Sequence, residues 1–331
     1  MTDLLPGFQL FALAAALYAA LGAMAVSVSL PWLRSTLQRW EPVARHRVLL
    51  LLASVPAGSA LVLLLAASLP SMLALAAPWL DHCIVHAGYH AHLCFVHLPE
   101  VGIRLGLLAA LAYLFARGLV RLTRAGVGFA RAARVVVGLE RSGEPSEVPG
   151  LILLHSTQPL CVAAGLFRPR ILMSRGLFGL LTPEERGVVI AHERAHIHRR
   201  DALTRAMVRA LTALHLPGVS AWLRKELDVA AEQACDEEAA VASGDRVHVA
   251  ATILKVERAT RAFNAGALAP VAMAFGATAV ERRVESLLGS PAPARSLRLP
   301  LLLLAGMGMA AFLFSDELHH LSELILSLIA H

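Results

Sequence analysis

The sequence predicts a mainly α membrane protein, with four transmembrane helices and an α+β soluble domain inserted between the third and the fourth. The first observation is the composition: 57% of the 331 residues are hydrophobic, only 16% are charged, and the mean hydropathy is +0.62. The second is a set of four apolar runs of about the length that a bilayer requires. The third is the position of the arginines, which cluster beside these runs.

The first three spans lie within a membrane domain, residues 1–120, at about 4–33, 48–69 and 101–120. The first lacks the basic start and the cleavage site of a signal peptide, so we interpret it as an uncleaved span. In the second, Pro56 predicts a kink and Pro70 predicts the end of the helix. The segment 294–331 holds the fourth span, at about 297–314, and a short amphipathic tail.

The arginines also predict the orientation of these spans. Four follow the first span and four follow the third: Arg34, Arg39, Arg45 and Arg47, then Arg121, Arg124, Arg131 and Arg134. The loop 70–99 contains no lysine or arginine, and only Arg104 disagrees with the pattern. Because positive residues stay on the cytoplasmic side, both termini are expected outside and residues 121–293 in the cytosol. This topology accounts for the net charge of +6, so we expect no direct nucleic-acid binding.

The outer loop 70–99 is rich in histidine and cysteine. Its candidate ligands are His82, Cys83, His86, His90, His92, Cys94 and His97. Imidazole and thiolate side chains bind zinc or copper, and cysteines outside the membrane can instead form a disulfide. Two interpretations stay open, an outer metal- or redox-sensing patch and a polar loop with a structural disulfide, of which the second is favoured.

Residues 121–293 form the predicted soluble domain. A basic helix over 121–141 continues from the third span, and a turn-rich linker follows at 140–150. Short strands are expected at 151–154, 161–167 and 170–173, in a small sheet or hairpin. A capping box at 182–185 starts the next helix, and further helices are expected at about 202–215, 219–242, 246–263 and 279–288.

The helix that starts at this capping box carries the motif His192-Glu193-Arg194-Ala195-His196. Residues four apart share a helical face, so both imidazoles can reach one metal ion, with Glu193 beside the open coordination position. Zinc suits such a site because it binds neutral imidazoles and acidifies a water molecule. The alternative, an amphipathic helix with two surface histidines, stays open until a third ligand is found.

Glu232 and Asp236 supply a candidate third ligand and its support. They lie four apart on the helix predicted over 219–242, so they share one face. In a site of two histidines and one glutamate, Glu232 would bind the metal. Asp236 would accept the second N–H of a ligating histidine and fix its tautomer. The alternative is a solvated acidic face that also includes Glu237 and Glu238.

These motifs resemble the zinc domain of the BlaR/MecR-type membrane metallopeptidases of bacteria. The resemblance extends over about residues 149–290 and includes the runs 162–172, 275–276 and 281–288. It implies a gluzincin-like domain, with Zn²⁺ bound by His192, His196 and Glu232, Glu193 as general base, and Asp236 behind a ligand. It also implies a bacterial inner-membrane location, in contact with lipid, and an edge strand that holds the substrate through Val162, Ala163, Ala164 and Gly165.

By this resemblance, we expect a zinc endopeptidase that signals by cleaving a cytosolic protein. The candidate substrates are a BlaI-type winged-helix repressor and the chain itself near the fourth span. Full-length receptors of the family carry a penicillin-binding domain after the last span. Only residues 315–331 follow here, so we do not transfer a β-lactam sensor role.

Two other functions stay open: a membrane quality-control protease resembling HtpX, and a non-catalytic receptor whose zinc fold binds a partner. The intact Glu193 argues against the receptor, because a binding site needs no general base. Arg194 and His198 differ from many relatives. The helical position of Arg194 points it away from the metal, and His198 is expected on the surface.

Overall fold

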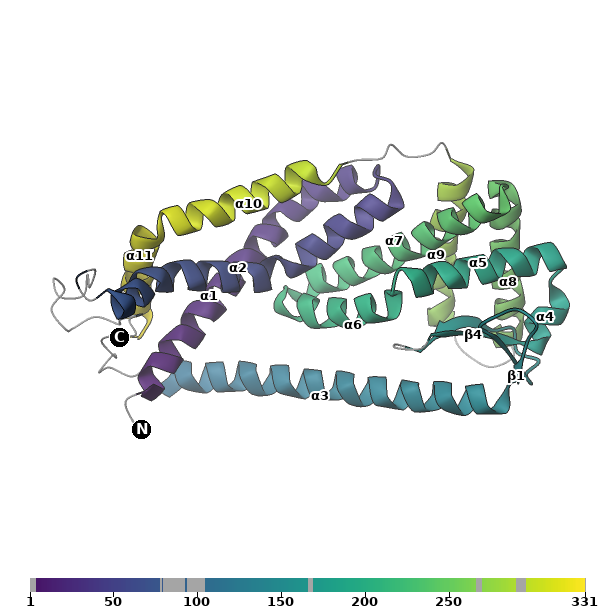
Figure 1. The fold of residues 1–331 in the computed structure, drawn as a ribbon, viewed down its shortest axis with the longest axis horizontal. Helices are drawn as coiled ribbons and strands as arrows, with labels where there is room; N and C mark the ends of the chain where they lie inside the picture. Colours follow the sequence, from purple (N-terminus) through teal and green to yellow (C-terminus); the bar gives the residue numbers. More distant parts are fainter. Residues whose placement is uncertain are drawn as a thin grey trace.

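The computed structural model describes residues 4–77, 79, 93, 105–165, 169–265, 270–289 and 296–330. Within them the protein is mainly helical, with one small sheet. Figure 1 shows the long apolar helices α1, α2 and α10 toward one end of the molecule, and the sheet with helices α4 to α9 toward the other. Both chain ends lie at the end formed by the long apolar helices (Figure 1).

Helices α1 (Leu4–Leu37) and α2 (Pro42–Ala76) form an antiparallel pair joined by a short turn. Among the described residues, the segments Gly7–Leu37 and Pro42–Ala76 are long and apolar enough to cross a membrane. One apolar cluster joins the two helices near the turn, and a second joins them toward their far ends. These helices contain the first two predicted spans, whose apolar helical character is confirmed.

The predicted end of the second span at Pro70 is wrong, because α2 continues to Ala76. A proline removes one N–H from a helix and so interrupts a single main-chain hydrogen bond. Apolar helices packed on their neighbours tolerate this loss. Pro31 and Pro56 likewise lie inside α1 and α2 without ending them.

Helix α3 (Leu105–Ser142) joins two predicted elements, the third span and the basic helix, into one. The predicted domain boundary at residue 120 therefore falls inside a continuous helix. Within its described residues α3 is not among the helices that are both long and apolar enough to cross a membrane, so the third span stays a prediction. The predicted histidine and cysteine patch lies outside the described residues: His82, Cys83, His86, His90, His92, Cys94 and His97.

Helices α10 (Arg298–Leu313) and α11 (Ser315–Ala330) occupy the region of the predicted fourth span and tail. They pass the span test only as a pair, bent by 78°, and would add one span if the pair crosses the membrane once. The tail is a helix that packs back onto α1 and α2. His319 is fully buried there, with Nδ1 2.7 Å from the Ala67 carbonyl oxygen.

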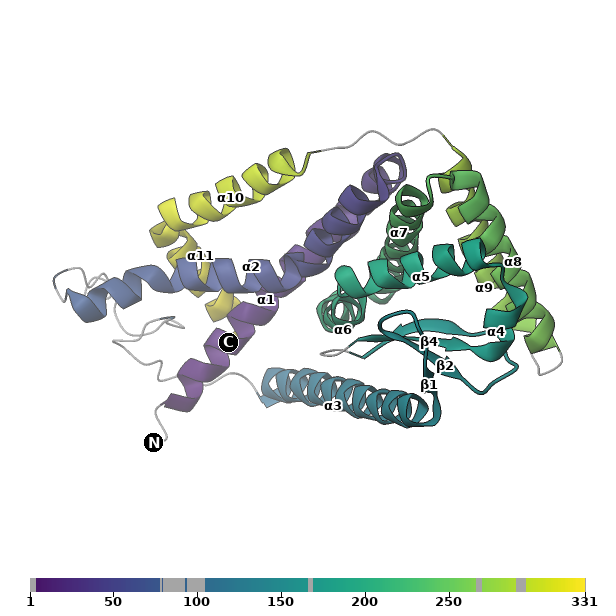
Figure 2. The same cartoon turned by 45° about the vertical axis from the view of Figure 1, so that its right-hand side comes forward.

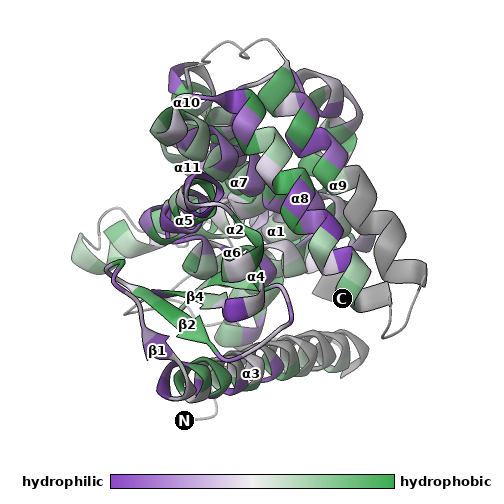
Figure 3. Ribbon diagram, turned by 90° about the vertical axis from the view of Figure 1, so that its right-hand side faces the viewer, coloured by the Kyte–Doolittle hydropathy of each residue, from purple (hydrophilic) through white to green (hydrophobic). Residues whose placement is uncertain are grey.

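The sheet has four strands in the order β1-β2-β4-β3: Glu144–Pro145, Leu151–Leu154, Arg170–Ser174 and Cys161–Ala164. Strands β2 and β4 are parallel, and the two outer pairs are antiparallel. Three strands lie where the sequence predicts them, but β1 falls in the predicted linker. A two-residue Glu-Pro strand carries no hydrophobic alternation that could identify it. Figure 3 shows the contrast between polar β1 and apolar β2.

The sheet is covered on both faces. The C-terminal part of α3 packs on one face through Val136 and Leu139, and helix α5 (Pro183–His198) packs on the other through Ile190 and Ile197. Figure 2 shows the sheet between these two helices. Strand β3 lies at the edge of the sheet next to α5, where its outer side faces the motif helix.

Five further helices complete this end of the described molecule. They are α4 (Arg175–Leu180), α6 (Asp201–Leu211) with the short 3-10 turn Thr212–Leu214, α7 (Pro217–Ser243), α8 (Arg246–Ala265) and α9 (Pro270–Leu288). Of these, α6, α7 and α8 pack directly on α5. Helix α7 packs against α2, α5, α8 and α9. It therefore connects the apolar helix pair directly to the helix that carries the motif.

Candidate metal centre

Helix α5 brings the two histidines of the motif together. It starts at the predicted capping box, in which the Thr182 hydroxyl accepts the Glu185 N–H and the Glu185 carboxylate accepts the Thr182 N–H. One helical turn separates His192 from His196, and their Nε2 atoms lie 3.2 Å apart. Both imidazoles are therefore aimed at one point.

Glu232 of α7 reaches the same point. Its Oε2 atom lies 3.5 Å from His192 Nε2, and its Oε1 atom lies 3.6 Å from His196 Nε2. Tetrahedral zinc binds such ligands at about 2.0–2.1 Å, which places neighbouring ligand atoms about 3.3 Å apart. The three residues therefore fit a zinc ion in both spacing and donor type, and three protein ligands leave a fourth position open.

A carboxylate lies behind each histidine. Asp236 Oδ1 is 2.9 Å from His192 Nδ1, and Asp201 Oδ2 is 2.7 Å from His196 Nδ1. A carboxylate in this position orients the ring and keeps Nε2 available to a metal. Asp201 reaches His196 through a sharp turn between α5 and α6, in which Arg200 has a left-handed φ of 54°.

Arginines balance the carboxylates. Arg283 of α9 donates from Nε and Nη2 to the two oxygens of Asp236, each at 2.7 Å, and its Nη1 lies 3.4 Å from Glu232 Oε2. Arg205 Nη2 donates to Glu232 Oε1 at 3.0 Å. Burial would raise the pKa of Glu232, but its bonds to the histidines and the charge of Arg283 hold that pKa well below its usual value.

The electrostatic balance at the histidines favours a cation. Burial lowers the pKa of His192, but Asp236 and Glu232 outweigh this effect and raise the pKa to about 9. The pKa of His196 is also raised, because Asp201 and Glu232 outweigh its burial. The field at the two Nε2 atoms therefore stabilises positive charge, which either a proton or a metal ion can supply.

Two thiols lie near the cluster. Cys235 Sγ is 3.3 Å from His196 Nδ1 and 3.6 Å from Asp201 Oδ2, and Cys161 lies on β3. Burial raises the pKa of both thiols, and nearby carboxylates raise it further. Both are therefore protonated at neutral pH, a form that neither attacks substrates nor binds metal well.

Strand β3 and Glu193 meet on the open side of the cluster. Glu193 is buried, and its Oε2 atom accepts the Ala163 N–H at 2.6 Å. The Ser174 N–H donates to the Leu160 carbonyl. Because alternate residues of an antiparallel strand bond to the same neighbour, the main chains of Val162 and Ala164 bond to β4. The main-chain groups of Cys161 and Ala163 consequently face the open edge, toward Glu193.

The four predicted substrate-binding residues fall into three groups. Ala163 has its main chain on the open edge, whereas Val162 and Ala164 have theirs in the sheet. Gly165 follows the strand with φ +100°, a left-handed value that glycine adopts without strain. Cys161, at the start of the predicted strand, also has its main chain on the open edge.

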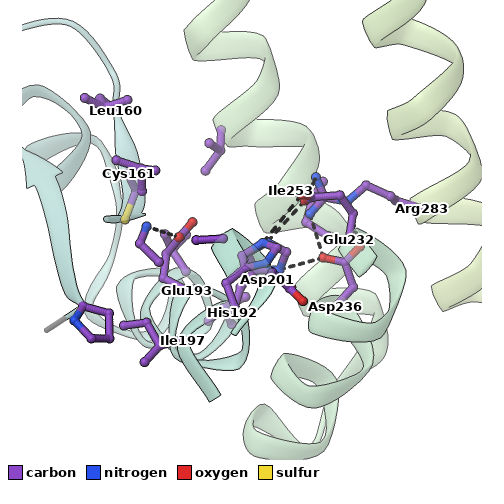
Figure 4. A pocket seen from close by; sticks show the side chains of 18 of the residues that line it. Leu160, Cys161, His192, Glu193, Ile197, Asp201, Glu232, Asp236, Ile253 and Arg283 are labelled. Atoms are coloured by element: carbon purple, nitrogen blue, oxygen red, sulfur yellow. Dashed lines mark hydrogen bonds and ion pairs between the residues drawn. The ribbon is translucent and has the colours of Figure 1, made fainter. Parts of the chain in front are cut away.

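A cleft of about 800 Å³ covers the cluster and the edge strand. His192, Glu193 and Glu232 form its polar floor, and Val249, Ile253 and Val256 of α8 form an apolar wall. Figure 4 shows Cys161 and the strand on one side of Glu193, and the histidine and Glu232 on the other. The cleft therefore joins a metal-binding point, a buried carboxylate and a strand edge.

Residues 149–287 match the family model described as BlaR1 peptidase M56. The chain carries an M56 peptidase domain. M56 peptidases are metal-dependent, and the His-Glu cluster together with the two apolar helices fits a membrane-bound metallopeptidase. No solved structure matches the chain.

The structure brings the predicted site residues together in one cleft: His192, Glu193, His196, Glu232 and Asp236. Arg194 and His198 are both exposed, as their helical positions predict. The roles of Asp201 and Arg283 were missed. Asp201 lies five residues after His196, a spacing that could have suggested it, whereas Arg283 lies on a distant helix and only the fold brings it to the site.

Proposed function

We propose that the protein is an integral-membrane zinc endopeptidase that cleaves a cytosolic protein substrate. The convergence of His192, His196 and Glu232 at 3.2–3.6 Å carries this proposal. The buried carboxylate of Glu193 and an open strand edge lie beside that point. The M56 match supports the same chemistry.

Different residues of the site would bind the metal, bind the substrate and transfer the proton. A zinc ion held by His192, His196 and Glu232 would supply a Lewis acid for the scissile carbonyl and for water. The outward main-chain groups of Cys161 and the Ala163 carbonyl would bind the substrate as an added strand, and the Ala163 N–H is already donated to Glu193. Glu193 would take the proton of the attacking water on its carboxylate and return it to the leaving amine.

The proposed location is the bacterial inner membrane, with both termini outside and the site in the cytosol. Both chain ends lie away from the catalytic domain in Figure 1, which supports this topology. The arginines at the other end of the helix pair support it too. Arg45 donates to Gln233 of α7, and Arg34 lies 5.0 Å over the ring of Trp222. Cations are expected on the cytosolic side.

We propose signalling as the role, with a BlaI-type winged-helix repressor or the chain itself as substrate. The resemblance of the motifs to the BlaR/MecR type supports this choice. The open strand edge also supports a protein substrate, because strand addition needs an extended polypeptide rather than a small molecule.

The test compares Glu193→Gln with the wild type in the full-length, membrane-reconstituted protein. We expect cleavage of the repressor and of the chain to fall by about 10²–10⁴-fold, because a positioned general base contributes that much. Bound zinc should be unchanged in Glu193→Gln and lost in Glu232→Gln. Glu238→Gln, an exposed position on the same helix as Glu232, is the matched control. Undiminished proteolysis in Glu193→Gln, or full zinc content in Glu232→Gln, would refute the assignment.

A further inference from the structure

The turn between α6 and α7 has the polarity of a membrane-facing surface. We call residues 210–223 the α6–α7 turn; it comprises the end of α6, the 3-10 turn and the start of α7. It contains no charged residue, although Arg209 precedes it and Arg224 follows it directly. A turn of a soluble enzyme is normally rich in polar residues that face water.

The few polar side chains of the α6–α7 turn all point inward. Thr212, His215 and Ser220 are 0%, 7% and 6% exposed. Thr212 donates to the Val208 carbonyl at 2.7 Å. In contrast, Leu214 and Leu216 are 48% and 51% exposed. This arrangement is the reverse of a water-facing turn, because the polar side chains are buried and apolar side chains are left outside.

The α6–α7 turn is seated on the apolar part of α2. His215 Nε2 lies 3.2 Å from the Ala53 carbonyl oxygen of α2, three residues before Pro56. Ala53 lies six residues beyond Arg47, the last charged residue of α2, or about 9 Å at the helical rise of about 1.5 Å per residue. In Figure 1 the turn lies beside α1 and α2, and α7 also contacts α2 beyond the turn.

Cationic and aromatic side chains surround the base of the α6–α7 turn. Arg209 and Arg224 are both exposed. Trp222 lies under the guanidinium of Arg34, 5.0 Å from it. Arginine beside tryptophan is typical of the boundary between acyl chains and headgroups, where the cation meets lipid phosphates.

We propose that the α6–α7 turn inserts into the bilayer leaflet on the catalytic side. Leu214 and Leu216 lie among the acyl chains, and Arg209 and Arg224 contact anionic phospholipid headgroups. Two observations select lipid as the occupant: the continuity of the turn with the apolar surface of α2, and the cations at its base. The insertion anchors α7, whose Glu232 lies sixteen residues, or about 24 Å, beyond Leu216. It therefore sets the height of the metal centre above the membrane.

The test places a photo-crosslinking residue at the turn. p-Benzoylphenylalanine replaces Leu214 or Leu216 in the full-length protein, reconstituted in vesicles of phosphatidylethanolamine and phosphatidylglycerol. The matched controls carry it at Val241 or Val247, which are 83% and 65% exposed at the opposite end of α7 and the start of α8. After irradiation, we expect phospholipid adducts by mass spectrometry at 214 and 216 and none at 241 and 247.

Two results would overturn the proposal. The first is an equal adduct yield at both ends of α7 or none at 214 and 216, and the second is crosslinking of 214 to a second copy of the chain. Circular dichroism of each variant checks folding, and position 216 decides the test if the variant at 214 does not fold. None of these readouts depends on peptidase activity.

Discussion

The two ends of helix α7 bury different kinds of polar group. At the N-terminal end, Thr212 and His215 just before the helix are neutral hydrogen-bonding side chains that contact main-chain carbonyls. Further along, α7 buries the carboxylates of Glu226 and Asp236, each held by two hydrogen bonds from an arginine of α9. Charges at one end and neutral groups at the other indicate that the two ends have different surroundings.

Energetics explain why the charges lie at one end only. A buried charge costs several kcal/mol unless a partner compensates it, and a hydrophobic pair of the same size is often as stable. Stability alone therefore does not account for a row of buried ion pairs. Near the candidate metal centre, carboxylates such as Asp236 orient the histidines and attract a cation, whereas the N-terminal end of α7 packs on apolar helices.

The largest effect is expected at the charged end, from Arg283→Met. This change leaves Asp236, which is 1% exposed, with His192 as its remaining cationic partner. Removing one member of a buried ion pair costs about 3–5 kcal/mol, which denaturant unfolding of the purified protein measures. Asp236→Asn in the same chain should recover part of the loss. Arg194→Met, at an exposed position on α5, is the control, and a loss no larger than in this control would show that the pair is not a major constraint.

The neutral end should respond less. His215→Ala removes the imidazole that contacts the Ala53 carbonyl, and the loss of one hydrogen bond of this kind costs about 0.5–1.5 kcal/mol. His215→Gln retains a donor of similar reach and should restore part of the stability, measured in the same unfolding assay. Equal loss in both variants would mean that shape, not the hydrogen bond, holds the α6–α7 turn on α2.

The charged end of α7 was the easier one to predict from the sequence. His192 with His196, and Glu232 with Asp236, lie at the helical spacing of four, and a metal site that uses that spacing can be recognised without coordinates. The contact between the two pairs comes from packing of α5 on α7, so spacing alone left a solvated acidic face open as the alternative.

Other features depend on contacts that have no local signal. Arg283 reaches Asp236 from α9, 47 residues further along the chain, so no local spacing predicts the contact. Strand β1 consists of two residues, too few to show an alternation of apolar and polar side chains. At the α6–α7 turn, the run Leu214 to Gly218 has the composition of an ordinary Pro-Gly connection. Only the burial of Thr212 and His215, together with the exposure of Leu214, identifies its unusual polarity.

The smallest effect is a change in pH dependence at Glu226, the other buried carboxylate of α7 that an arginine of α9 holds. Burial alone would raise the pKa of Glu226. Arg282, which donates to its carboxylate at 2.7 and 2.8 Å, has the opposite effect and outweighs burial, so the pKa of Glu226 lies below the ordinary value of 4.5. A carboxyl with a lowered folded-state pKa stabilises the protein above the unfolded pKa, and this contribution is lost as the pH falls through the folded pKa.

We therefore expect the wild type to lose more unfolding free energy than Glu226→Gln as the pH falls below about 4.5. The difference is limited to about 1.4 kcal/mol per pH unit, because one group binds at most one proton. Denaturant unfolding at a series of acidic pH values measures both slopes, with the exposed Glu238→Gln as the matched control. Parallel curves for wild type and Glu226→Gln would mean that Arg282 does not perturb Glu226. Perturbation of buried carboxylates on α7 would then be limited to those at the candidate metal centre.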